Sequence, residues 1–145
     1  MTIPKVSATA EQLIGCSFDY YISMKILVDH QNNSTIEPIG LLASHSLELA
    51  LKSFLYFKDK KILASKLNHN LEKAWKASVD NGLQVPLQPP YWVRVLNYGN
   101  DSPFVYRYPQ EKTAIAIPDS NELVSELINI INIIKGNFLI HSDVV

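Results

Sequence analysis

Residues 39–61, with the sequence IGLLASHSLELALKSFLYFKDKK, constrain the fold more than any other stretch. No Gly or Pro lies between Leu41 and Lys61, so nothing interrupts a helix there. The apolar side chains recur at helical spacing and predict one buried stripe, made of Leu42, Ala43, Leu47, Ala50, Leu51 and Phe54. A helix with such a stripe must pack against other helices. We therefore expect one long helix at the centre of a bundle.

A polar line, His45, Glu48 and Lys52, runs along the same predicted helix at steps of three and four. At about 100° per residue, these side chains lie within about 60° of one another. Apolar residues share their stripe, which argues against open solvent there: Leu41, Leu55 and Tyr56. At a surface, Glu48 and Lys52 would form a pair worth a few tenths of a kcal/mol. In a partly buried network or a working site, each charge would need a partner.

The composition predicts a single globular domain over residues 1–145. The chain is 47% hydrophobic and 19% charged, and 145 residues bury enough apolar surface to fold unaided. A formal net charge of -1 gives no nucleic-acid footprint across the whole chain. An RNA contact would need a local basic patch, for which the sequence offers the cluster Lys58, Lys60, Lys61 and Lys66.

The lack of a recognisable targeting signal and the low cysteine content predict a cytoplasmic protein. The N-terminus shows no charged leader followed by an apolar core, and no apolar run reaches the roughly 18 residues of a membrane span. The single cysteine, Cys16, cannot form an internal disulfide and fits a reducing compartment. Because it lies on the apolar face of a predicted helix, we expect Cys16 to be a small buried side chain.

A first helix precedes the central one. Thr9 followed by Gln12 is a capping box, and the helix should end near His30. Its predicted apolar face is widened by three further apolar residues and consists of Leu13, Cys16, Tyr20, Met24 and Leu27 with Ile14, Phe18 and Tyr21. Residues 31–34 form a short polar connection, which favours an antiparallel hairpin with the central helix.

Shorter elements follow the central helix. Asn70 is a cap for a third helix that Gly82 would end, and a short fourth helix is expected at residues 91–97, after Pro90. Residues 100–118 are irregular, with a possible short strand at 113–117. Asp119 begins a second capping box, for a last helix that contains LVSELINIINIIK and that Gly136 would end. The predicted fold class is all-α: an up-and-down bundle of about four long helices with an irregular loop before the last.

The sequence lacks motifs for metal, nucleotide or serine chemistry. The histidines are scattered, and none pairs with another at helical ligand spacing: His30, His45, His69 and His141. The five glycines never cluster into a phosphate-binding loop, and no serine elbow is present. We therefore expect no metal ion and no cofactor.

A possible constellation joins Glu48, Lys52, His69, Arg107 and Tyr108. A guanidinium can bind a carboxylate bidentately, so Arg107 held by Glu48 would anchor the irregular segment on the central helix. We prefer this structural interpretation. The alternative is an active site in which His69 acts as general acid or base, and Arg107 and Lys52 stabilise a phosphate.

Three segments resemble the HEPN superfamily: HSLELALKSFL at residues 45–55, NHNLEKAW at 68–75, and RYP at 107–109 ahead of the last helix. Many bacterial members show a Glu-Leu-Ala-x-Lys segment followed by His-Asn/Asp-Leu, and both patterns occur here. The resemblance covers most of the chain. It implies a bundle of about four helices that is usually dimeric.

The resemblance also bears on catalysis. Many HEPN proteins are metal-independent RNases of toxin–antitoxin, phage-exclusion or CRISPR systems, with an Arg followed about four to six residues later by His on the last long helix. Others are non-catalytic partners of nucleotidyltransferases. Here neither Arg94 nor Arg107 is followed by such a His, and His141, expected beyond the last helix, has no Arg shortly before it. This departure argues against the usual RNase chemistry.

The sequence thus favours a non-catalytic HEPN-like binding module of bacterial defence or toxin–antitoxin type, acting as a homodimer or through a protein or RNA partner. Exposed aromatic residues would help to form its surface: Tyr91, Trp92, Tyr98 and Tyr106.

Two alternatives stay open. One is a metal-independent RNase or other phosphate-processing enzyme with an unusual site around His69, Arg107 and Lys52. The other is a small-molecule sensor with a pocket between the second and third helices. Geometry separates the enzyme from a scaffold. An enzyme needs His69, Arg107 and Lys52 to converge on an open cleft, whereas a scaffold would bury them without a cavity.

Overall fold

Six α-helices make up the described part of the computed structural model, which covers residues 8–101, 104–108 and 115–142, the last three by their backbone alone. Three helices are long: α1 (Ala10–Asp29), α2 (Ile36–Phe57) and α6 (Ser120–Ser142). Three are short: α3 (Lys61–Lys66), α4 (Leu71–Asp80) and α5 (Tyr91–Asn100). The described residues contain no strand, and of the expected strand only 115–117 lie among them. The all-α class is confirmed, with three long helices instead of about four.

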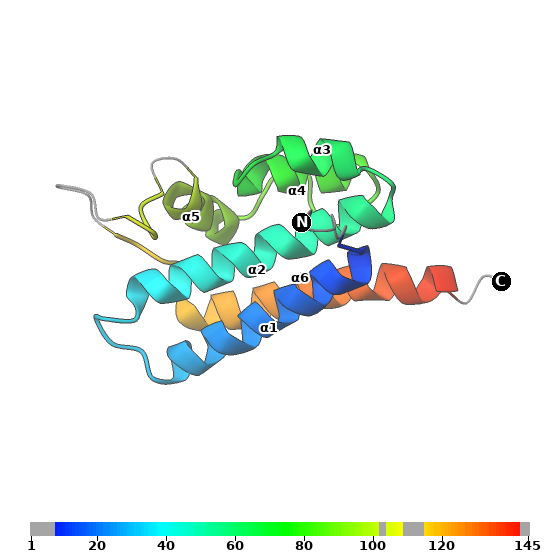
Figure 1. Ribbon diagram of the computed structural model, residues 1–145. Helices are drawn as coiled ribbons and strands as arrows, with labels where there is room; N and C mark the ends of the chain where they lie inside the picture. The colour runs from blue at the N-terminus through cyan, green and yellow to red at the C-terminus, as the bar shows by residue number, and fades with distance from the viewer. Residues whose placement is uncertain (1–7, 102–103, 109–114, 143–145) are drawn as a thin grey trace, which may run out of the picture.

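The central helix α2 separates two layers of helices (Figure 1). α1 runs antiparallel to α2, as predicted, and together with α6 forms the lower layer. The short helices α3, α4 and α5 cover the other side of α2 as an upper layer. α2 contacts all five other described helices, which explains why its apolar side chains are buried almost all round.

The hydrophobic core is shared by both layers. Each described helix contributes to it, with members such as Ile14, Leu47, Ala64, Leu71, Leu96 and Ile131. The rings of Trp75 and Trp92 meet edge to face at 6.4 Å, which joins α4 to α5. None of the helices, over the residues that are described, is long and apolar enough to cross a membrane.

The buried face of α1 contains three residues of the predicted face, Ile14, Tyr21 and Met24, and adds Ala10 and Ser17. Ser17 is fully buried, whereas Cys16 is exposed, so the expectation of a buried cysteine was wrong. The hydroxyl of Ser17 donates to the carbonyl of Ser46 at 2.6 Å, and the Ser46 hydroxyl donates to the Ser17 carbonyl at 2.8 Å. Small side chains let α1 and α2 approach closely at this point. Ser17, a polar residue, therefore occupies the centre of the α1–α2 interface, where Cys16 was expected.

α2 ends earlier than predicted, at Phe57, because the chain adopts a Schellman motif there. The N–H of Lys60 bonds the carbonyl of Leu55 at 2.8 Å, and the N–H of Asp59 bonds that of Tyr56 at 3.1 Å. Asp59 supplies the required left-handed residue, with φ of 57°. Residues 61–66 then form the separate helix α3.

The helix caps of α1, α4 and α6 follow the prediction. Thr9 and Gln12 form a complete capping box, and the side chains of Asn70 and Asp119 accept from the N–H groups of Lys73 and Glu122 at 3.0 Å each.

The predicted stop at Gly136 was wrong, because α6 continues to Ser142 and its backbone includes position 141. The ring of Phe138 packs on that of Phe57 at 4.7 Å, so contact with the end of α2 stabilises the last turns of α6. The side chain of His141 lies outside the described residues.

Candidate functional site

The carboxylate of Glu48 is the centre of a buried polar network. Glu48 lies on α2 and is 5% exposed. Its Oε1 atom is 2.9 Å from Nδ1 of His69, and its Oε2 atom is 3.5 Å from Nζ of Lys52. A carboxylate can only accept, so the imidazole donates from Nδ1 and its other nitrogen, Nε2, remains for another contact. Of the interpretations left open for the polar line, the geometry matches the partly buried network, because Glu48 is buried while Lys52 and His69 keep some exposure.

The same network holds the turn between α3 and α4 against α2. The ammonium of Lys52 donates to the carbonyl of Asn68 at 2.7 Å, while the side-chain amide of Asn100, on α5, donates to the carbonyl of His69 at 3.0 Å. Asn68 itself has a left-handed backbone, with φ of 51°. Lys52 and His69 are therefore fixed by structural hydrogen bonds on both sides of the turn.

Arg107 does not pair with Glu48. No ion pair joins them among the described residues, and the guanidinium instead lies over the ring of Phe104 at 5.9 Å. Phe104 in turn meets the imidazole of His69 edge to face at 5.9 Å. Arg107 thus reaches the network through an aromatic ring and remains exposed. The expected Glu48–Arg107 anchor is replaced by a cation–π contact of Arg107 with Phe104 and an edge-to-face contact of Phe104 with His69.

The anchor of residues 104–108 is Tyr106. Its buried ring packs against Gly40 of α2 and Gly99 of α5, so close that a Cβ at Gly40 would be 2.7 Å from the ring. Its hydroxyl donates to the carbonyl of Ala116 at 2.8 Å, and its backbone N–H donates to the carbonyl of Gly99 at 3.0 Å. Burial raises the pKa of the Tyr106 phenol well above its usual value.

A cavity of about 320 Å³ lies between α1, α2 and the 104–108 segment, lined by Tyr20, Leu41, Leu42, His45 and Arg107. The imidazole of His45 meets the ring of Tyr20 edge to face at 4.5 Å. Burial lowers the pKa of His45; the positive charge of Arg107 adds to this, and the carboxylate of Glu48 opposes it. His45 is therefore a neutral side chain at neutral pH.

The predicted constellation is brought together only in part. Glu48 contacts both Lys52 and His69 directly. Arg107 lines the neighbouring cavity, and neither Lys52 nor His69 is among the residues that line it. Tyr108 is exposed and lines another cavity, of about 210 Å³, with residues that include Glu37 and Val105. Over the described residues, neither of these two cavities has Lys52, His69 and Arg107 together in its lining.

Sequence reasoning missed the residues of α5 that fix the site. Asn97 accepts from the N–H of Leu71 at 2.7 Å and donates to Glu72 at 2.9 Å, and Asn100 holds His69 one turn later. Their spacing of three places both amides on the same face of α5. That spacing was the available signal.

A metal site is a further possibility for titratable side chains of this kind. Across the described ranges, no three His, Cys, Asp or Glu side chains are grouped so that they could hold a metal ion. No family model, curated protein or solved structure matches this chain. The site's own geometry therefore has to carry the functional argument.

Proposed function

We propose that this protein is a non-catalytic, HEPN-like binding module that contacts single-stranded RNA through its upper layer. The observation that carries the non-catalytic part is the use of the site's donors. Lys52 is bonded to Asn68 and paired with Glu48, and His69 Nδ1 is bonded to Glu48. A phosphate-processing site needs such donors directed at substrate, and here they hold the turn between α3 and α4 instead.

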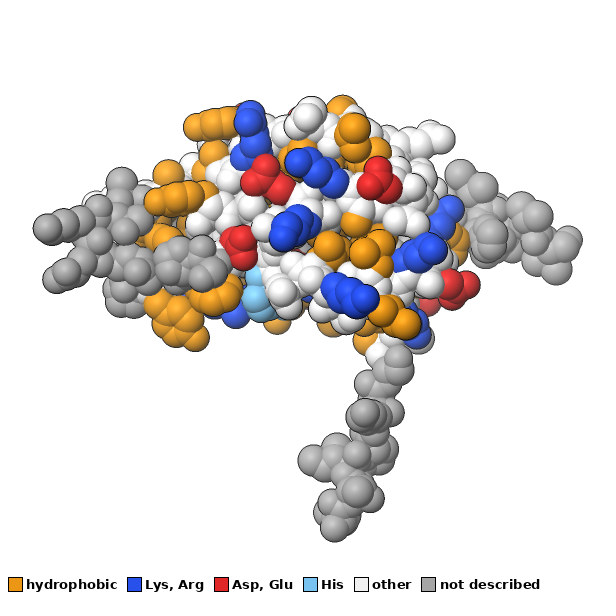
Figure 2. Space-filling view, turned by 90° about the horizontal axis from the view of Figure 1, so that it is seen from above, with side chains coloured by type: hydrophobic (Ala, Val, Ile, Leu, Met, Phe, Trp, Pro, Cys, Tyr) orange, Lys and Arg blue, Asp and Glu red, His pale blue; other side chains and the backbone are white. Residues whose placement is uncertain are grey.

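The distribution of charge supports a polyanionic partner. Residues 51–101, which include the end of α2 and the upper layer, hold eight Lys or Arg and four Asp or Glu. That is a net charge of +4, against -5 for the rest of the chain. Figure 2 looks down on the upper layer and shows Lys and Arg side chains spread across it. Asp and Glu side chains lie between them, so the excess of positive charge is modest, but it offers a local footprint for phosphates on a chain of nearly neutral total charge.

Contacts with aromatic rings position two of the lysine ammonium groups. The ammonium of Lys58 lies 5.6 Å from the centre of the Phe54 ring, and that of Lys61 lies 5.4 Å from the centre of the Tyr56 ring. These contacts position two cations at the junction of α2 and α3. Together with the exposed Lys60 and Lys66, they form the basic cluster of the proposed surface.

Binding of a 5′-labelled 12-mer oligouridine, followed by fluorescence anisotropy at several salt concentrations, tests this proposal. Contact with about four to six phosphates gives a slope of log K against log [salt] of about -3 to -4. Lys60→Gln/Lys66→Gln should flatten the slope by about 1.4. Lys25→Gln/Lys135→Gln removes two charges from the lower layer and should leave the slope unchanged. Equal effects of both pairs would contradict the assigned surface.

A second candidate is metal-independent phosphodiester cleavage, which the Glu48–His69 hydrogen bond favours. A carboxylate on Nδ1 orients an imidazole so that Nε2 can transfer a proton, and Arg107 lies one aromatic ring away. Incubation of labelled total RNA with the purified protein, without added metal, separates the two functions. Cleavage that is lost in folded His69→Ala and Arg107→Ala would establish the enzyme.

A further inference from the structure

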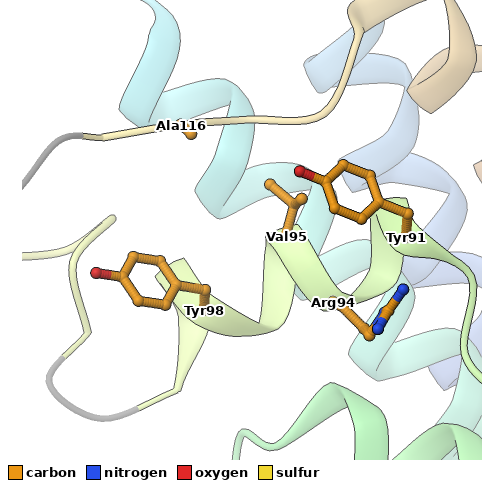
Figure 3. A pocket seen from close by; sticks show the side chains of 5 residues that line it. All are labelled: Tyr91, Arg94, Val95, Tyr98 and Ala116. Atoms are coloured by element: carbon orange, nitrogen blue, oxygen red, sulfur yellow. The ribbon is translucent and has the colours of Figure 1, made fainter.

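A separate aromatic pocket lies on the outer face of α5, away from the Glu48 network. It has a volume of about 300 Å³ and is lined by Tyr91, Arg94, Val95, Tyr98 and Ala116. Figure 3 shows the ring of Tyr91 beside Val95 on the side of α5 that faces Ala116, with Tyr98 farther along the helix and Arg94 directed to the other side, below Tyr91. The four α5 residues follow one another at helical spacing, so their backbone positions lie on one face of the helix.

Both tyrosines are unusually open for large aromatic side chains. Tyr91 is 71% exposed and Tyr98 is 63% exposed, while their neighbours Trp92 and Leu96 point into the core. Of the four aromatic residues expected at the surface, Tyr91 and Tyr98 are exposed, whereas Trp92 and Tyr106 are buried, so the expectation was wrong for those two. Exposed aromatic rings beside an apolar floor are suited to stacking on a planar ligand.

The charge at the rim selects the kind of planar ligand. The guanidinium of Arg94 lies 5.9 Å from the centre of the Tyr91 ring, and among the described residues no acid lines the pocket. An arginine next to a stacking ring can bind a phosphate while the ring carries a base. The surrounding upper layer has the positive net charge described above. A nucleotide therefore matches the site better than an uncharged proline-rich peptide does.

From this geometry we infer that the outer face of α5 is a base-stacking platform for single-stranded RNA, with bases on Tyr91 and Tyr98 and a phosphate on Arg94. The two tyrosines are seven residues apart, which is about 10 Å along a helix. They would therefore contact two different bases, and Val95 forms the floor between them. The inference rests on the proposed RNA-binding function, to which it adds recognition of bases.

Oligouridine and an abasic oligonucleotide of equal length and charge distinguish stacking from charge attraction. Stacking predicts that the 12-mer with bases binds about 5- to 150-fold more tightly for each base engaged. Tyr91→Ala and Tyr98→Ala should each remove one such factor without changing the salt slope, while Tyr91→Phe and Tyr98→Phe should retain it. Ile26→Ala, which removes an exposed apolar side chain from α1, is the control and should have no effect.

The possible failures are separable. Binding that is equal for the two oligonucleotides, and unaffected by either alanine variant, overturns the platform and leaves the RNA-binding function in place. If the unmodified protein binds neither oligonucleotide, both the platform and the RNA-binding function are overturned. A proline-rich decapeptide that shifts the NMR signals of Val95 and Tyr98, where uridine monophosphate does not, would assign the pocket to a peptide instead.

Discussion

Removal of the Glu48 carboxylate should lower the free energy of unfolding by about 2 kcal/mol. A hydrogen bond to a charged group contributes about 1.5–3 kcal/mol, and breaking a fully buried pair costs about 3–5 kcal/mol. Glu48 is buried, but the side chains of His69 and Lys52 are 37% and 19% exposed, so water can solvate them after the change. The lower range applies for that reason. At about 2–4 °C per kcal/mol, the midpoint of thermal unfolding should fall by about 4–8 °C.

A double-mutant cycle assigns this loss to the network. Urea unfolding of Glu48→Ala, His69→Ala and the double variant should give a coupling energy of about 1–2 kcal/mol. Glu126→Ala, at an exposed position of α6, serves as the control and should change the free energy of unfolding by less than about 0.5 kcal/mol. Additive effects of the two site variants, or an unchanged midpoint for Glu48→Ala, would refute the network.

Three further predictions concern the backbone and pH. Asp59→Gly should raise the free energy of unfolding by up to about 1 kcal/mol in urea titrations, because glycine relieves the left-handed residue after α2. Gly99→Ala should lower it by about 1–3 kcal/mol through overlap with the Tyr106 ring, whereas Gly15→Ala, with open space around it, should be neutral or stabilising. His45 has a lowered pKa in the folded state, so the unfolded chain binds the proton more readily below pH 6.5. Stability should therefore fall as the pH decreases below 6.5, and His45→Gln should reduce that dependence; an equal pH profile in the variant would contradict it.

Local signals in the sequence were sufficient for most helix starts. The caps at Thr9, Asn70 and Asp119 depend on one side chain and a nearby N–H group, so spacing alone identifies them. The ends of α2 and α6 were missed because tertiary contacts decide them. Asp59 takes a conformation usually given to glycine, and helical packing of Phe138 on Phe57 carries α6 past Gly136.

The candidate site was also predictable only in part. The i,i+4 spacing of Glu48 and Lys52, and the position of His69 at the start of α4, place three members of the network near one another. The position of Arg107 depends on where the 104–108 segment returns. Tyr106 decides that by fitting against Gly40 and Gly99, a steric match between distant positions that no local pattern contains.

Anisotropy and gel analysis of one sample, the protein with 5′-labelled oligouridine and no added metal, test the central claim most directly. The account predicts salt-dependent binding, with a slope of about -3 to -4, of RNA that stays intact throughout. Binding independent of salt, or cleavage that disappears in folded His69→Ala, would contradict it.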